Sequence, residues 1–301
     1  MTGEQLEIRH GAARAIVTTA GAGLRAFEVD GVPYSETYGA DETPPLGAGG
    51  VLVPWPNRVA GAVWVHDGDV QKLEVTEAAR GNAIHGLVRR STWTVTDHSE
   101  SAVTLEIDMD GADGWPFSFN TGITYALDDT GLTVTHTVSN TGTAPMPFGV
   151  GTHPYPRPGN VDVDDCELVL AATTVVPIDA DTMIPNGAPV EVEGTSADFR
   201  SGRPLRGVEL DTAFGGCEPG DDGFVRHAVR HAGGGVEVWA EPVFRWVQAF
   251  TPSEFPGKGA RAVAIEPMTC PPDALNSGTD LITLPPGESW TGSWGITPID
   301  R

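Results

Sequence analysis

The chain has 301 residues and a formal net charge of −23, from 41 acidic and 18 basic residues. A surface of this sign repels phosphate backbones and anionic lipids, so we expect no nucleic-acid partner and no membrane partner. Three cysteines without a C-x-x-C spacing and a polar first segment indicate neither a disulfide framework nor a signal peptide. No apolar run is long enough to span a bilayer, and the sequence therefore predicts a cytoplasmic protein.

Short runs of alternating apolar and polar residues follow one another along the chain and predict strands. These runs lie within residues 6–8, 15–17, 24–29, 63–73, 92–97, 103–110, 117–127, 132–140, 224–230, 236–249 and 281–299. No helix longer than a few turns is indicated, and 38 glycines and 25 prolines suit many turns. We expect an all-β protein, a large antiparallel β-sandwich or barrel that forms a single domain over residues 1–301.

The segment 54–58, PWPNR, is rigid because two prolines flank Trp55. An aromatic ring followed by Arg58 suits a polyhydroxylated ligand, since the ring offers an apolar face and the guanidinium donates to oxygens. Arg58 could equally hold a long loop in place by hydrogen bonds to carbonyl groups.

Three histidines differ in their local context. His85 lies in a loop before Gly86 and is a candidate for function, although a lone histidine is more often structural. His153 comes directly before Pro154, which fixes an extended backbone and favours a functional role. His136 shares one face of a predicted strand with apolar residues, so we interpret it as a core residue.

Two carboxylates are the remaining candidates. Asp211 stands between apolar neighbours, where aspartate is disfavoured in a strand, so a turn or a ligand contact is expected. Glu266 follows the apolar run Ala262–Ile265, and Pro267 is expected to end that strand or to form a bulge in it. This context indicates a placed acid or base, whereas an arbitrary glutamate at a strand end would point into water.

The pattern excludes several chemistries. There is no phosphate-binding loop and no G-x-S-x-G elbow, so we expect no nucleotide site. Two histidines and two acids could bind a metal, but without an H-x-x-x-H or C-x-x-C pair zinc is the minor alternative and we expect no metal. A histidine with a carboxylate and without a nucleophile is suited to proton transfer.

Five segments in this order resemble those of the aldose 1-epimerases, the galactose mutarotase-like family: PWPNR (54–58), NAIHG (82–86), GTHPY (151–155), DTAF (211–214) and IEPMTCPPDAL (265–275). The closing PGESW (286–290) is similar as well, and the matches span nearly the whole chain. The resemblance implies a galactose mutarotase-like β-supersandwich with an open cleft, no cofactor and a small monosaccharide as ligand. We expect a monomer or a dimer.

The resemblance also implies roles for the candidate residues. Glu266 would be the general base that takes the proton from the anomeric hydroxyl, and His153 the general acid that protonates the ring oxygen. Arg58 and His85 would bind sugar oxygens. Asp211 would accept hydrogen bonds from hydroxyl groups.

The preferred sugar and two rival classes remain open. PWPNR and the arginine after NAIHGLV resemble a bacterial branch that includes sulfoquinovose mutarotases. Arg80 or Arg89 could meet an anionic substituent, as in sulfoquinovose or a hexose 6-phosphate, or could be surface charge. A neutral aldohexose is the first expectation. The rivals are a non-catalytic carbohydrate-binding module and a glycoside hydrolase that uses Asp211 and Glu266 as its carboxylate pair.

Overall fold

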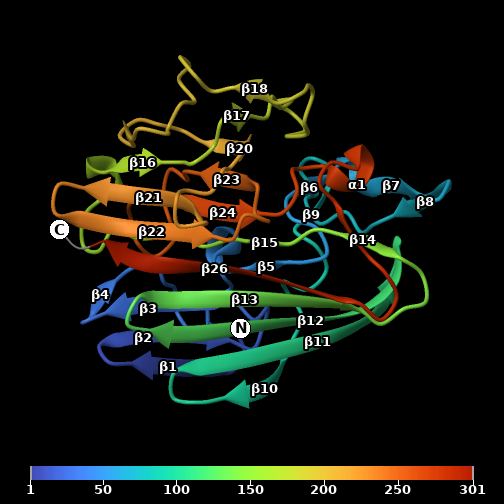
Figure 1. Cartoon of the computed structure of the whole chain (residues 1–301), viewed down its shortest axis with the longest axis horizontal. Helices are drawn as coiled ribbons and strands as arrows, with labels where there is room; N and C mark the ends of the chain where they lie inside the picture. Colours follow the sequence, from blue (N-terminus) through green and yellow to red (C-terminus); the bar gives the residue numbers. More distant parts are fainter. Residues whose placement is uncertain (1, 300–301) are drawn as a thin grey trace.

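The computed structural model describes residues 2–299, and its regular structure consists almost entirely of antiparallel β-strands (Figure 1). The largest sheet has nine strands in the order β10-β11-β12-β13-β26-β22-β21-β16-β19. Their bounds are Thr94–His98 (β10), Ala102–Ala112 (β11), Trp115–Asp128 (β12), Gly131–Asn140 (β13), Glu167–Val169 (β16), Arg203–Pro204 (β19), Val225–His231 (β21), Gly234–Ala240 (β22) and Ser289–Ile299 (β26).

A second large sheet has seven strands in the order β18-β17-β20-β23-β24-β15-β5. Their bounds are Val51–Leu52 (β5), Gly151–Thr152 (β15), Thr174–Val175 (β17), Val190–Glu191 (β18), Asp211–Gly215 (β20), Trp246–Phe250 (β23) and Ala264–Met268 (β24). Side chains of both large sheets, such as Val238 of β22 and Val247 of β23, belong to one hydrophobic core that runs from Leu6 to Ile296. The architecture is the predicted large antiparallel sandwich.

Smaller elements complete the fold. A four-stranded sheet packs with β1 and β2 against β11 and β12 (Figure 1). Its strands are Gln5–His10 (β1), Ala13–Thr18 (β2), Leu24–Val29 (β3) and Val32–Pro33 (β4). Three strand pairs are Arg58–Val59 (β6) with Ala83–Ile84 (β9), Val63–His66 (β7) with Asp69–Lys72 (β8), and Met146–Phe148 (β14) with Ile282–Leu284 (β25). The helical elements are the 3-10 turns Pro45–Gly47 (η1), Ala60–Ala62 (η2) and Val163–Asp165 (η3) and the α-helix Ala274–Ser277 (α1).

Strand β13 illustrates how the alternating pattern builds the core. Leu132, Val134, His136 and Val138 are all buried, while the residues between them are only partly covered. Successive side chains of a strand point to opposite faces, so this register puts one row into the sandwich. The predicted core position of His136 is confirmed. Within the described residues, no helix is long and apolar enough to cross a bilayer.

Two local predictions near the site were wrong. Strand β24 does not end at Glu266 but continues through Pro267 to Met268, because Pro267 still pairs in register with Val247 of β23. Strand β24 has β23 on one side and β15 on the other, so Glu266 lies within the sheet rather than at the end of a strand. Asp211 does not form a turn either, since it opens strand β20 opposite Phe250. The alternative prediction for Asp211, a ligand contact, remains open.

Candidate active site

His153 and Glu266 are brought into contact by neighbouring strands of the seven-stranded sheet. His153 follows β15 directly, and Glu266 lies on β24, which pairs with β15. The His153 Nε2 atom lies 3.4 Å from Glu266 Oε1, and the two side chains are 6% and 2% exposed. The two side chains thus lie side by side, although 112 positions separate them in the sequence.

The segment before β5 and two aromatic rings fix the position of His153. Its backbone N–H donates to the Gly50 carbonyl at 3.1 Å, and its carbonyl accepts from the Gly49 N–H at 2.9 Å. The imidazole stacks on Tyr155 with a centroid separation of 5.3 Å and meets His85 edge-on at 5.5 Å. The ring therefore has little freedom to turn away from Glu266.

Burial shifts both members of this pair toward their neutral forms. It lowers the pKa of His153 to about 4. It raises the pKa of Glu266 well above the ordinary value, with a further rise from Asp211 that Arg58 opposes. Because a low-dielectric site disfavours an isolated charge on either group, the pair favours holding one proton in total.

His85 is turned into the site by two consecutive residues in the left-handed region. It follows β9 with φ 65°, and Gly86 has φ 68°. A Cβ on Gly86 would lie 2.1 Å from the Val53 carbonyl oxygen, so only glycine fits there. The bend at Gly86 therefore directs the His85 imidazole into the site.

A backbone hydrogen bond sets the tautomer of His85. The Asn57 N–H donates to His85 Nδ1 at 3.2 Å, so the proton of the neutral ring is on Nε2. Burial lowers the pKa of His85 well below its usual value, and nearby positive charge at Arg89 and Arg58 adds to this. His85 is accordingly a neutral donor.

Arg58 is anchored by a carboxylate rather than by carbonyl groups. Its Nε and Nη2 atoms donate to Glu77 at 3.0 to 3.2 Å, and Nη2 lies 3.6 Å from Asp211 Oδ2. The backbone of Arg58 is fixed as well, because its carbonyl accepts from the Asp273 N–H at 2.7 Å. The expected hydrogen bonds from Arg58 to carbonyl groups are thus replaced by a carboxylate partner, while its contact with sugar oxygens stays a prediction.

Gln248 connects several of these residues and was missed from the sequence. Its Nε2 donates to Asp211 Oδ1 at 2.7 Å, and its Oε1 accepts from Asn57 Nδ2 at 3.2 Å. It pairs in register with Glu266. The available signal was a single buried polar residue in the otherwise apolar strand WVQAF.

These side chains surround a hollow of about 280 Å³. Its walls are Leu46, Asn57, Arg58, Glu77, Ile84, His85, His153, Asp211, Gln248, Phe250 and Glu266. All five candidate residues thus meet at one place. Trp55 does not, because it is 3% exposed and packs against Trp115 at a centroid distance of 5.6 Å. The prediction that Trp55 offers its face to a ligand was wrong.

The model of the family described as Aldose 1-epimerase matches residues 4–297. The chain belongs to the aldose 1-epimerase family. It is therefore an isomerase, which decides among the three classes that the sequence left open.

Several relatives of this epimerase are similar over different lengths. The protein YihR of Escherichia coli K12 is 29% identical over 95% of this chain and 91% of its own length. Galactose mutarotase of Rattus norvegicus is 30% identical over 50% of this chain, an alignment that spans 45% of the rat protein. A galactose mutarotase-like protein from Clostridium acetobutylicum superposes with a TM-score of 0.86 at 19% identity, covering 98% of this chain and 95% of that one. The GalM/aldose epimerase homologue from C. elegans reaches 0.84 at 20%, over 99% of both chains.

Two arginines of the epimerase that the sequence left open have different surroundings. Arg80 is ion-paired with Glu77 at 3.1 Å. The Arg89 guanidinium forms no hydrogen bond or ion pair with any described residue, and burial lowers its pKa to about 10. It lines two smaller hollows, of about 160 and 270 Å³, the second of which shares Leu46 with the site.

One group of side chains in the described part of the epimerase could hold a metal ion. The donor atoms of His85, His153 and Glu266 lie within 4.8 Å of one another. Two imidazoles and a carboxylate are suitable ligands for a divalent transition metal.

Proposed function

We propose that this epimerase interconverts the α and β anomers of a neutral aldohexose by opening and reclosing the pyranose ring. The observation that carries the proposal is the contact of 3.4 Å between His153 Nε2 and Glu266 Oε1 at the wall of a hollow of about 280 Å³. The anomeric oxygen and the ring oxygen are both bonded to C1. Two proton carriers that lie side by side can therefore reach both oxygens of one bound sugar.

In the forward direction, the Glu266 carboxylate takes the proton of the anomeric hydroxyl while His153 protonates the ring oxygen. The bond between C1 and the ring oxygen breaks, and C1 becomes the carbon of an aldehyde. Rotation about the C1–C2 bond presents the other face of the carbonyl. In reclosure, neutral His153 takes the proton from the new hydroxyl and Glu266 returns one to the carbonyl oxygen, so the pair regains its starting state.

The shared proton makes these two states accessible. Burial lowers the pKa of His153 and raises that of Glu266, so it opposes the usual preference of the proton for imidazole and makes the state with the proton on the carboxyl accessible. Each positioned proton carrier contributes a factor of about 10²–10⁴ to the rate.

The neighbours of the pair suit the binding roles that the family resemblance implies. The Nε2–H of His85 would donate to a sugar oxygen, since its Nδ1 is engaged by Asn57. The remaining donors of Arg58 would stabilise negative charge on an oxygen in the transition state. Asp211, held by Gln248, would accept from hydroxyl groups.

Polarimetry of freshly dissolved α-galactose and α-glucose tests the proposal. We expect the protein to accelerate the approach to the equilibrium rotation in proportion to its concentration, and Glu266→Gln to abolish nearly all of this acceleration. If neither sugar equilibrates faster than in buffer, the neutral aldohexose is the wrong substrate.

An anionic sugar is the second candidate, and the unpaired Arg89 favours it. The Arg89 guanidinium is half-buried, lies near the site hollow and has no counterion. Such a group suits a sulfonate or phosphate substituent of a sugar. Anomeric exchange of glucose 6-phosphate, measured by NMR saturation transfer, tests this candidate. Exchange faster than that of glucose, with the advantage lost in Arg89→Gln, would support it. Equal or slower exchange would reject it.

A further inference from the structure

A second hollow next to the site is positively charged, although the chain as a whole has a formal net charge of −23. This arginine hollow has a volume of about 270 Å³, and Arg89 and Arg90 are both part of its wall. Among the described residues, no aspartate or glutamate lines it. The site hollow, by contrast, is lined by three acidic residues and one arginine. The two neighbouring hollows therefore suit ligands of different charge.

Neither arginine of the arginine hollow has a counterion. In the described part of the chain, the guanidinium groups of Arg89 and Arg90 form no hydrogen bond and no ion pair. The burial of Arg89 and the positive charge of Arg90 together lower the pKa of Arg89 to about 10. A charge that is partly withdrawn from water is normally paired with an opposite charge. An anion bound in the hollow would be that partner for both side chains.

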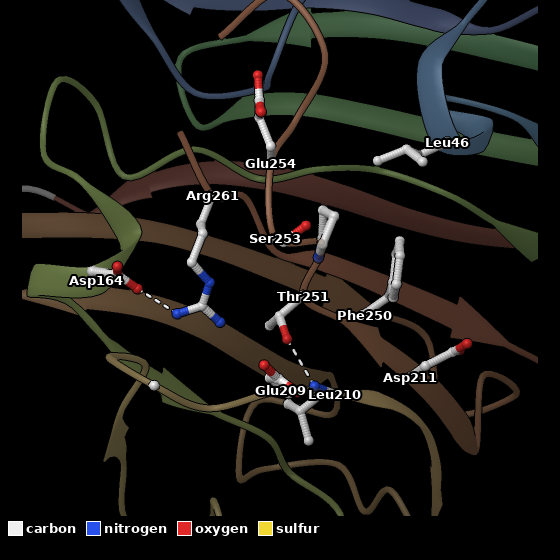
Figure 2. A pocket seen from close by; sticks show the side chains of 12 residues that line it. Leu46, Asp164, Glu209, Leu210, Asp211, Phe250, Thr251, Ser253, Glu254 and Arg261 are labelled. Carbon is white, nitrogen blue, oxygen red and sulfur yellow. Dashed lines mark hydrogen bonds and ion pairs between the residues drawn. The ribbon is translucent and has the colours of Figure 1, made fainter. Parts of the chain in front are cut away.

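A larger groove beside the site hollow shows the opposite arrangement. It has a volume of about 810 Å³ and shares Asp211 and Phe250 with the site hollow. Arg261 in its wall donates to Asp164, and Figure 2 shows this pair within the groove. The lack of a counterion is therefore a feature of the arginine hollow and not of every arginine that lines a hollow in this protein.

The chemistry of the wall favours a small oxyanion. Two guanidinium groups offer several N–H donors, which match the acceptor oxygens of a sulfate or phosphate ion. Thr43 adds an exposed hydroxyl group, and Gly21 and Gly47 have no side chain that would keep a small ligand away from the main chain. An uncharged ligand would leave both positive charges uncompensated. A polyanion would be repelled by the acidic surface of the protein.

Gly47 separates the arginine hollow from His153. It lines the hollow, and a Cβ on Gly47 would lie 3.0 Å from Cδ2 of the His153 ring. Among the described residues, only Leu46 lines both this hollow and the site hollow. An ion beside Arg89 therefore leaves the space next to His153 free for a hexose.

We propose that the arginine hollow binds a free tetrahedral oxyanion, such as sulfate or phosphate, independently of the sugar in the site hollow. The anion site does not depend on which reaction the site hollow performs. The same chemistry is offered by the phosphate or sulfonate group of an anionic sugar, so the experiment has to separate the two sources.

Equilibrium dialysis of radiolabelled sulfate against the full chain, in excess sodium chloride, tests the site. The variants are Arg89→Gln and Arg230→Gln, which remove the same charge. Arg230 is an exposed residue of β21 outside the hollow and has no ion-pair partner in the described part of the chain. We expect the parent and Arg230→Gln to bind sulfate alike and Arg89→Gln to lose affinity by about tenfold or more. Equal binding by the two variants would overturn the proposal.

Thermal unfolding provides a second readout and shows whether each variant is folded. Sulfate stabilises folded proteins in general, so the informative quantity is the difference between variants of equal charge. We expect sulfate to raise Tm less in Arg89→Gln than in Arg230→Gln, because only the second variant keeps the site. Arg90→Gln is the alternative hollow variant if Arg89→Gln does not fold. An equal rise of Tm in a folded hollow variant and in Arg230→Gln would contradict the anion site.

Anomerisation kinetics in sulfate separates a free ion from a substituent of the sugar. Each rate is corrected for the rate in protein-free buffer of the same composition. We expect sulfate to leave KM for α-galactose unchanged, because the ion and the hexose occupy different hollows. A KM for α-galactose that rises with sulfate would overturn the independent site. A KM for glucose 6-phosphate that rises with sulfate would assign the arginine hollow to the phosphate of the sugar and would overturn it as well. If no sugar is accelerated, the proposed function has failed, and sulfate binding by the parent but not by Arg89→Gln would still support the anion site.

Discussion

His136 and His153 are buried histidines in two regions of the molecule, and their imidazole rings have different partners. Both rings are almost inaccessible, and burial lowers their pKa values to about 3 and about 4. His136 lies on β13 of the nine-stranded sheet, where its Nε2 accepts from the Trp294 indole N–H at 3.0 Å. His153 instead directs Nε2 at Glu266. The contact partner of the imidazole therefore distinguishes a structural histidine from a candidate catalytic one, whereas burial and pKa do not.

The backbone around the two histidines differs as well. His136 sits within a regular strand, but His153 lies between Gly151 and Pro154 at the end of a two-residue strand. A Cβ on Gly151 would come within 2.6 Å of the Pro56 ring. The glycine therefore permits the proline-rich segment to pack closely, and that segment leads to Arg58. The irregular backbone around Gly151 and Pro154 thus sets the position of His153, whereas His136 is held by a regular strand.

We expect the largest loss of activity from a change in Glu266, the carboxylate that contacts His153 and has no counterpart beside His136. Glu266→Gln keeps the size of the side chain but removes the base, so we expect kcat to fall by about 10³-fold or more. Polarimetry gives the rate, and thermal unfolding shows whether the variant is folded. A folded Glu266→Gln protein that retains more than about a tenth of the parent rate would contradict the assignment.

The pH dependence of kcat/KM probes the same pair without a substitution. Because the pKa of His153 is lowered to about 4, the pair takes up a second proton only below that pH, and neither group can then accept a proton from the sugar. We expect activity to be retained as the pH falls through 6.5 and to decline about tenfold per unit below about 4. An acid limb near the ordinary histidine value of about 6.5 would show that His153 titrates as an exposed group.

Arg58 sharpens the comparison by testing binding apart from proton transfer. Arg58→Ala removes a charged donor from the hollow and leaves Glu77 with Arg80 and Asn82 as its remaining partners, so we expect KM to rise about tenfold or more. Arg80→Ala, which removes the more exposed partner of Glu77, is the matched control with a smaller expected change. Steady-state kinetics on both variants separates KM from kcat. Equal effects would mean that Arg58 acts only through Glu77.

His136→Leu should have the smallest effect on the rate and a clear effect on stability. The change leaves the buried Trp294 N–H without an acceptor, which costs about 1–3 kcal/mol of unfolding free energy. We expect kcat of the folded protein to stay at the parent value. Chemical denaturation and polarimetry of the same sample provide the two readouts, and a rate loss like that of a His153 variant would abolish the distinction between the two regions.

Acid sensitivity of folding provides a second measurement on His136. Its pKa is near 6.5 in the unfolded chain and about 3 when folded, so the unfolded state binds the proton first as the pH falls. Stability should therefore decrease between about pH 6.5 and 3, with His136 contributing up to about 1.4 kcal/mol per pH unit. His136→Leu should show a shallower decrease, and an identical slope would contradict the buried neutral ring.

The strand pattern was predictable because it depends on local sequence, whereas the local arguments for Glu266 and Asp211 failed and the set of five candidates also rested on the family resemblance. Period-two alternation located β13, and the residues flanking His153 distinguished it from His136. Contacts between distant segments were not predictable in this way. Nothing near Trp55 indicates that Trp115 covers it, and nothing near Arg58 indicates that Glu77 anchors it. The strand pairing that carries β24 through Pro267 is likewise a property of β23.

The residue roles, the preferred sugar, the cytoplasmic location and the monomeric or dimeric state stay predictions. The fold and the family follow from patterns that extend over the whole chain. The roles depend on the behaviour of a few atoms, and the remaining properties depend on partners and surroundings that local sequence does not encode.

A double-variant cycle on fresh α-galactose tests most directly whether His153 and Glu266 act as one proton-sharing unit. Rates of mutarotation are measured for His153→Asn, Glu266→Gln and the protein that carries both changes. If the two residues act together, the double variant will be no slower than the slower single variant. Losses that multiply in the double variant would show that the two groups act independently and would contradict the account.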